Sequence, residues 1–204
     1  RAAVRRELGI DPAAPLLVYA GSIGPKYLFA PVRDFARALG RVRPDARLLV
    51  LTGSPELAHA ALGADAPLSP LVMNVPPRDV GRYLAAADLG LAFYQDRFST
   101  QAIAPLKVAE YLLCGVPVLG TAAVGPTQAA LDAGMFLDES AGPEEAVRWL
   151  MEEILPHRES VRARARTVGT ENFSLRRSVA DYLRAIAGIG PATPPLPPSG
   201  APHR

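Results

Sequence analysis

The sequence predicts an α/β fold built on a doubly wound parallel sheet of about six strands. Short apolar runs alternate with longer stretches of helical periodicity along most of the 204 residues. This alternation is typical of βαβ crossovers, which join parallel strands. The apolar runs contain few polar positions, which indicates a sheet that helices cover on both faces.

The expected strands are short apolar runs, and the clearest are the first two, where Leu16 to Ala20 and Leu48 to Leu51 are uninterrupted. The sixth strand has the weakest pattern. We expect strands at residues 16–20, 47–52, 71–75, 89–93, 116–120 and 135–137.

Helical periodicity fills the intervals between these strands and continues after the last one. The expected helices are residues 31–42, 56–62, 78–87, 103–114, 126–133, 143–155, 158–170 and 175–187. Ser174 is the expected N-cap of the last helix, because its hydroxyl can accept a hydrogen bond from the first turn.

One domain is expected over residues 1–187, followed by a Pro/Gly-rich tail at 188–204 that we expect to be disordered. The chain opens on Arg1 within a charged stretch and has no initiator methionine, so we expect a piece of a longer protein.

Composition excludes several classes of protein. The formal net charge of +2 gives no general attraction to nucleic acid. The single cysteine, Cys114, cannot form an internal disulfide, so a reducing compartment is allowed. No apolar run approaches the roughly 20 residues that span a bilayer. We expect a cytoplasmic protein whose contact with a membrane, if it has one, is peripheral at the inner face.

The most informative feature is the position of the two lysines, Lys26 and Lys107, among 22 basic residues. In a doubly wound sheet, ligands bind outside the carboxyl ends of the strands, where the strand order reverses. In the six-stranded form this point lies between the first and fourth strands. Lys26 follows the first strand and Lys107 follows the loop after the fourth. Two cations at one crevice suit a diphosphate.

The expected helix at 103–114 carries a set of polar residues on one side. Pro105 suits a helix start, where free N–H groups attract an anion, and Lys107 lies in the same turn. Glu110 follows three residues later, where its carboxylate can accept hydrogen bonds from ribose hydroxyls. The alternative is a plain helix start with an exposed Lys107–Glu110 pair. Val108 and Leu112, on the opposite side, are expected in the core.

Gly21 and Gly24 form a GxxG pattern, which lets the backbone approach a ligand but more often marks a simple turn. Three arginines, Arg158, Arg162 and Arg166, recur every four residues. This stripe is expected to be a solvated face, with docking to an anionic membrane or to a further domain as the alternative.

Residues 105–118 resemble the carboxy-terminal signature of GT-B glycosyltransferases of the family-4 type, also called group 1. So do residues 19–22 with Lys26 downstream, residues 83–91, and residues 172–174 with the helix that follows. The resemblance covers about residues 1–187. It implies a Rossmann-like domain, the carboxy-terminal, donor-binding half of a GT-B fold, with the amino-terminal acceptor domain absent from this chain.

The resemblance implies roles for single residues. Lys26, Lys107 and Glu110 would be the catalytic groups: the two lysines on the donor diphosphate, and Glu110, the second glutamate of the family's E-x7-E pattern, on the ribose. The backbone at the exit of the third strand, from Met73 to Val75, would offer polar groups to the base. The full set expected to bind the donor is Gly21, Ser22, Val75, Pro105, Leu106, Lys107 and Glu110.

Two positions depart from the family pattern. Ala102 stands where the first glutamate of E-x7-E is expected, and Ser22 stands where an arginine often follows the strand-one glycine. The missing glutamate normally touches the donor sugar. Asp96, in the same loop, is a candidate substitute, although a solvated loop acid is the simpler interpretation.

The function implied is binding of a nucleoside-diphosphate sugar for a retaining, metal-independent transfer to an acceptor glycan, lipid or small molecule held by the missing domain. No cofactor and no metal are expected, because the sequence has no Asp-x-Asp motif and its histidines lack metal-ligand spacing. A non-catalytic nucleotide- or partner-binding module, favoured by Ala102, and half of a sugar-nucleotide epimerase remain alternatives.

Overall fold

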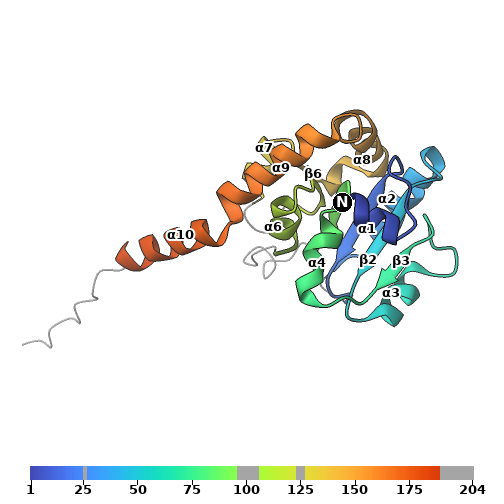
Figure 1. Cartoon of the computed structure of the whole chain (residues 1–204), viewed down its shortest axis with the longest axis horizontal. Coiled ribbons are helices and arrows are strands. Elements are labelled where there is room, and N and C mark those ends of the chain that lie inside the picture. Colours follow the sequence, from blue (N-terminus) through green and yellow to red (C-terminus); the bar gives the residue numbers. More distant parts are fainter. Residues whose placement is uncertain (25–26, 96–105, 123–126, 189–204) are drawn as a thin grey trace, which may run out of the picture.

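The computed structural model describes residues 1–24, 27–95, 106–122 and 127–188 (Figure 1). Its centre is a six-stranded, all-parallel sheet with the strand order β3-β2-β1-β4-β5-β6. The predicted fold class and the reversal of strand order between the first and fourth strands are therefore confirmed. The strands are β1 (Leu16–Ala20), β2 (Arg47–Leu51), β3 (Leu71–Met73), β4 (Leu89–Ala92), β5 (Val118–Gly120) and β6 (Phe136–Asp138).

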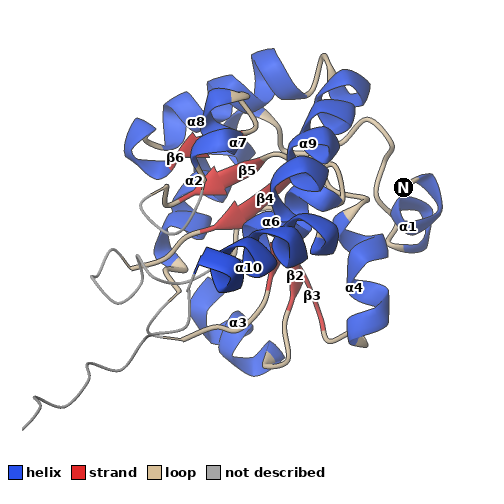
Figure 2. Ribbon diagram, turned by 90° about the vertical axis from the view of Figure 1, so that its left-hand side faces the viewer, coloured by secondary structure: helices blue, strands red, loops and turns tan. Residues whose placement is uncertain are grey.

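Helices cover both faces of the sheet, as Figure 2 shows. This explains the apolar strands, because every residue of β1, β4 and β5 is buried. Strand β3, at the edge, is only half-buried and is shorter than the 71–75 expected. The sequence predicted the positions of all six strands, but most of the expected ranges are one or two residues longer than the strands in the structure.

The helices agree with the sequence patterns in position more than in length. They are α1 (Ala2–Glu7), α2 (Ala30–Val42), α3 (Pro55–Leu62), α4 (Pro77–Leu84), α6 (Leu106–Leu113), α7 (Gln128–Asp132), α8 (Pro143–Trp149), α9 (Arg158–Phe173) and α10 (Leu175–Gly188), with a 3-10 turn η1 (Glu139–Ala141) and a π-helical turn η2 (Leu150–Ile154). The helix expected at 143–155 is thus α8 continued by η2. The Ser174 hydroxyl accepts a hydrogen bond from the Arg177 N–H at 3.3 Å, which confirms the N-cap of α10.

Helix α1 was not predicted, because its six residues lack capping side chains and a clear apolar face. It is fixed by Arg5, which is 2% exposed. The Arg5 guanidinium donates to the Ala86 carbonyl at 3.0 Å, to the Ala14 carbonyl at 2.8 Å and to the Asp88 carboxylate at 2.7 Å. A charged residue therefore anchors the first helix against the amino-terminal end of β4.

The arginine stripe on α9 is not a free solvated face, so that prediction is wrong for two of its three members. Arg158 donates to the Asp88 carboxylate at 3.0 Å, and Arg162 donates to the Ala87 carbonyl at 3.3 Å. Both arginines tie α9 to the chain just before β4. Only Arg166 remains exposed.

Close backbone packing holds α6 against α9. A Cβ atom at Gly169 would lie 2.6 Å from the carbonyl carbon of Leu112, which is closer than real Cβ contacts come. Gly115 has a φ of +75°, and a Cβ there would lie 2.9 Å from the Arg162 carbonyl oxygen. Two glycines thus allow the close approach that fixes the position of α6.

Helix α10 extends away from the rest of the domain (Figure 1). None of its residues is buried. Its exposed large apolar side chains are Leu175, Val179, Tyr182, Leu183 and Ile186.

Candidate functional site

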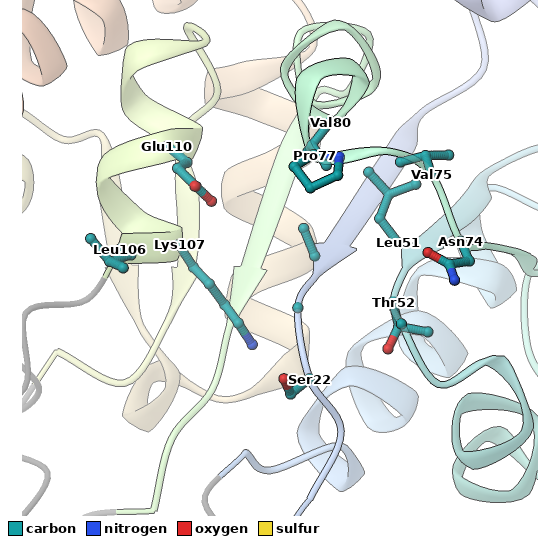
Figure 3. Close-up of a pocket in the computed structure, with 13 residues that line it drawn as sticks. Ser22, Leu51, Thr52, Asn74, Val75, Pro77, Val80, Leu106, Lys107 and Glu110 are labelled. Carbon is teal, nitrogen blue, oxygen red and sulfur yellow. The ribbon is translucent and has the colours of Figure 1, made fainter.

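A cavity of about 390 Å³ opens at the carboxyl ends of β1 and β2, beside the first turn of α6 (Figure 3). The polar groups around it come from several separate segments of the chain. Its lining residues are Ala20, Gly21, Ser22, Leu51, Thr52, Gly53, Asn74, Val75, Pro77, Val80, Leu106, Lys107 and Glu110. The cavity lies at the reversal of strand order, where ligands bind in doubly wound sheets.

The structure brings together the described site residues that the sequence predicted. Gly21 and Ser22 follow β1, Val75 follows β3, and Leu106, Lys107 and Glu110 lie on α6; all six line this one cavity. Lys26, Asp96, Ala102 and Pro105 lie outside the described residues.

Lys107 is the cation among the described residues that line the cavity, and it is almost completely buried, with 8% of its surface exposed. Its Nζ donates a hydrogen bond to the Tyr19 hydroxyl at 3.0 Å. The same Nζ lies 4.1 Å from the ring centroids of Tyr19 and Tyr27, and 5.6 Å from that of Tyr94. Electron-rich ring faces attract a cation at these distances. Three tyrosines therefore surround the ammonium.

Gly21 makes room for this lysine. Its φ of +126° favours glycine, and a Cβ atom there would lie 2.7 Å from the Lys107 Cε. The Gly21 N–H donates to the Leu51 carbonyl at 2.8 Å, which continues the β1–β2 pairing into the cavity wall. The GxxG pattern thus serves a close approach at its first glycine. At Gly24 an added Cβ would meet nothing within 4 Å.

The electrostatics of the cavity follow from burial. Desolvation lowers the pKa of Lys107 to about 7, and the negative charge of Glu110 acts in the opposite direction. Desolvation raises the pKa of the Glu110 carboxyl, and the Lys107 charge opposes this shift. The cavity therefore combines a cation that is easily deprotonated with a carboxylate further along α6.

Tyr111 is a structural residue of the site to which the sequence analysis assigned no role. It is fully buried on α6, and its hydroxyl accepts a hydrogen bond from the Ala20 N–H at 2.8 Å and donates to the Leu91 carbonyl at 3.3 Å. The backbone pairing of β1 with β4 runs only to Val18 and Gly90. The hydroxyl thus links the two strands beyond the point where their pairing ends.

Four further lining residues were not predicted from the sequence: Thr52, Gly53, Pro77 and Val80. They lie on the loop after β2 and on α4, where no charged or glycine-rich motif marks them. The parallel pairing of β1, β2 and β3 could have indicated them, because it brings the carboxyl ends of these strands to one edge.

In the described residues, no group of three or more His, Cys, Asp or Glu side chains is arranged to hold a metal ion. No helix in the same part of the chain is both long and apolar enough to cross a membrane.

No protein-family model matches the chain. Among curated proteins, it is 31% identical over 211 residues to a D-inositol 3-phosphate glycosyltransferase of Segniliparus rotundus, covering 92% of this chain and 44% of the relative. It is 33% identical over 145 residues to the protein of the same name from a Mycobacterium species, covering 66% of this chain and 30% of the relative. The chain thus spans less than half the length of these relatives.

Solved structures share the fold. WaaG, a glycosyltransferase involved in lipopolysaccharide biosynthesis, superposes with a TM-score of 0.65 at 21% identity, over 93% of this chain and 51% of WaaG. HepE of Anabaena, solved in complex with UDP and glucose, gives a TM-score of 0.63 at 15% identity, over 92% of this chain and 52% of HepE. These matches show that the fold is shared, and together with the curated relatives they confirm the resemblance drawn from the sequence.

Proposed function

Because the chain is a Rossmann-like domain related to GT-B glycosyltransferases of the family-4 type, we propose that it binds a nucleoside-diphosphate sugar in the cavity beside Lys107. The single observation that carries the proposal is the convergence of six expected donor-binding residues on one cavity at the reversal of strand order. A volume of about 390 Å³ lies within the range of small-molecule sites.

In the proposed arrangement, the diphosphate lies between the backbone after β1 and the first turn of α6. Gly21 lets the backbone approach, and the Lys107 ammonium supplies positive charge where the leaving diphosphate gains negative charge. Preorganised charge of this kind stabilises a transition state without further reorganisation. Lys26, in the sequence after Gly21, is proposed as a second cation on the diphosphate.

The nucleoside is proposed to extend toward β3. Glu110 lines the same cavity one turn of α6 beyond Lys107, where its carboxylate can accept hydrogen bonds from ribose hydroxyls. Asn74 and Val75 offer backbone polar groups to a base, and Pro77 and Val80 offer apolar surface. HepE has been solved with UDP-glucose, so uridine nucleotides are the first to test.

The whole protein is proposed to transfer the sugar to an acceptor with retained anomeric configuration and without a metal ion. The acceptor, a glycan, lipid or small molecule, is proposed to bind mainly in the part of the protein that this chain does not span. Closure of two domains over the donor would exclude water from the reaction.

Calorimetry of the chain with UDP-glucose, UDP-N-acetylglucosamine, GDP-mannose, UDP and uridine tests the proposal. We expect at least one nucleotide sugar to bind, and uridine to bind at least tenfold more weakly than UDP. Glu110→Gln keeps the size of the side chain but removes its charge, and should weaken nucleotide binding by about 1–2 kcal/mol. Glu153→Gln, an exposed glutamate outside the cavity, is the matched control. Equal affinity of the Glu110→Gln variant and the wild type would refute the ribose role.

A non-catalytic nucleotide-binding module remains a second candidate, because Ala102 replaces the glutamate expected to touch the sugar. The two functions differ in their readout. In the whole protein, a donor that binds but is neither transferred nor hydrolysed would favour the second. Sugar transfer that persists with EDTA, and whose product keeps the anomeric configuration of the donor by NMR, would favour the glycosyltransferase.

A further inference from the structure

The environment of Lys107 is unusual for a buried cation. In the described part of the chain, no carboxylate forms an ion pair with its Nζ, and its hydrogen-bond acceptor is the neutral Tyr19 hydroxyl. Buried charges are ordinarily paired with an opposite charge. The contacts found instead are the hydroxyl of one tyrosine and the ring faces of three.

The three tyrosines are themselves firmly held. Tyr19 is fully buried on β1, and its ring meets that of Phe29 edge-on with centroids 5.1 Å apart. Its hydroxyl also donates to the Ser22 carbonyl at 2.7 Å, which leaves an oxygen lone pair for the lysine. Tyr27 and Tyr94 are joined by an isolated antiparallel bridge, and their rings are 5.6 Å apart. We call Tyr19, Tyr27 and Tyr94 the tyrosine cage of Lys107. Burial in β1 holds Tyr19 in place, and the backbone bridge joins Tyr27 to Tyr94.

We propose that Tyr19 is a positioning residue for Lys107: with the rings of Tyr27 and Tyr94, it holds the lysine ammonium at the cavity without neutralising it, so that an anionic ligand supplies the missing counter-charge. The proposal deepens the donor-binding function and rests on it for the identity of that anion. Tyr19 acts through Lys107, and its hydroxyl is the atom that carries the effect.

The charge state of Lys107 then depends on the cage and on the ligand. The titratable groups that face it in the described residues are Tyr19 from β1, Tyr27 from the following loop, Tyr94 after β4, and Glu110 on α6. Burial raises the pKa of Tyr19 and of Tyr94 well above the ordinary value, so both stay neutral. Burial lowers the pKa of Lys107 to about 7. A hydrogen bond to the charged form favours that form, so the Tyr19 hydroxyl raises the lysine pKa.

The experiment uses the fact that the chain has two lysines. The full chain is labelled with [6-13C]lysine, the two side-chain signals are followed by NMR as a function of pH, and Lys107→Arg identifies the Lys107 signal. We expect the Lys107 signal to titrate with a midpoint well below pH 10.5. Tyr19→Phe should lower this midpoint by about a further half to one pH unit. Tyr27→Phe is the control, because Lys107 contacts the ring of Tyr27 and not its hydroxyl.

A second titration in saturating UDP-glucose, and one in GDP-mannose, separates this inference from the donor-binding function. Binding of the diphosphate should raise the Lys107 midpoint by more than about one pH unit, since a nearby anion favours the charged amine. If Tyr19→Phe lowers the Lys107 midpoint but neither nucleotide sugar raises it, the positioning role of Tyr19 stands and the proposed donor site is refuted. If a nucleotide sugar moves it but Tyr19→Phe leaves it unchanged or raises it, the positioning role is overturned. A wild-type midpoint at or above 10.5 also overturns it.

Discussion

The Tyr111 hydroxyl accepts a hydrogen bond from the backbone N–H of Ala20 at 2.8 Å, at the point where β1 has separated from β4. Without this hydroxyl the Ala20 N–H would be buried without a partner, because the neighbouring strand no longer reaches it. The same hydroxyl donates to the Leu91 carbonyl. One side chain from α6 thus completes the hydrogen bonding of two strand ends and fixes the distance between the helix and the cavity wall.

Tyr111→Phe should therefore lower the free energy of unfolding by about 1–3 kcal/mol, the cost of leaving buried polar groups unsatisfied. Chemical denaturation followed by circular dichroism measures the effect. Tyr182→Phe is the matched control, since Tyr182 is 70% exposed on α10 and should lose less than about 0.5 kcal/mol. A loss as small for Tyr111 as for Tyr182 would show that water or backbone movement satisfies the strand ends.

Gly21→Ala should weaken binding of UDP-glucose or GDP-mannose by at least about tenfold. The positive φ disfavours alanine, and the new Cβ would push the Lys107 Cε, 2.7 Å away, out of its position. Gly24→Ala is the control from the same loop, because its Cβ would meet nothing within 4 Å. Calorimetry of both variants checks the prediction. If the two lose affinity equally, the loop as a whole matters, not the contact of Gly21 with Lys107.

Asp88→Asn should lower the free energy of unfolding by about 3–5 kcal/mol, because it breaks a buried ion pair and leaves Arg5 without its counter-charge. Asp88 also accepts hydrogen bonds from the Leu16 N–H and from Arg158, and it pairs with Arg1, so one substitution affects α1, β1 and α9. Asp181→Asn, which breaks exposed pairs on α10, should cost less than about 1 kcal/mol. Comparable losses for both variants would contradict the structural role of Asp88.

How much of this structure the sequence predicts depends on the kind of interaction. Strand positions and the site of reversal follow from apolar runs and from spacing, so Lys107 and Glu110 could be assigned to one cavity. The tyrosine cage could not, because Tyr19 reads as an ordinary strand residue and Tyr27 and Tyr94 as loop residues. Their shared contact with Lys107 exists only after β1 and β4 are adjacent.

The same limit explains why the arginine stripe on α9 was wrongly predicted to be a solvated face. Periodicity assigns Arg158 and Arg162 to one side of a helix, which for arginine normally means solvent. Their acceptors lie far earlier in the sequence: Asp88 is 70 residues before Arg158, and the Ala87 carbonyl is 75 residues before Arg162. Local pattern contains no information about such partners. Helix α1 was not predicted for a related reason. It is stabilised by Arg5 through hydrogen bonds to Ala86 and Asp88, which are distant in the sequence.

Lys107→Met should stabilise the domain near neutral pH while abolishing nucleotide-sugar binding. A buried lysine whose pKa is lowered to about 7 destabilises the folded state as long as it is charged, and methionine fills the same space without a charge. We expect a gain of about 1–3 kcal/mol at pH 6, less than the full pKa shift implies, because the contacts with the tyrosine rings are lost. Gain of stability with loss of binding is typical of residues kept for function.

The gain from Lys107→Met should shrink as the pH rises. Between about 7 and 10.5 the unfolded chain binds a proton at this lysine that the folded chain does not, so the wild type becomes more stable relative to the variant over that range. Guanidinium denaturation of both proteins at pH 6 and pH 9 measures the difference. Arg166→Met, which removes an exposed cation from α9, should change stability by less than about 0.5 kcal/mol at either pH. A Lys107→Met variant that is less stable than the wild type at pH 6 would mean that the cage stabilises the ammonium more than burial destabilises it.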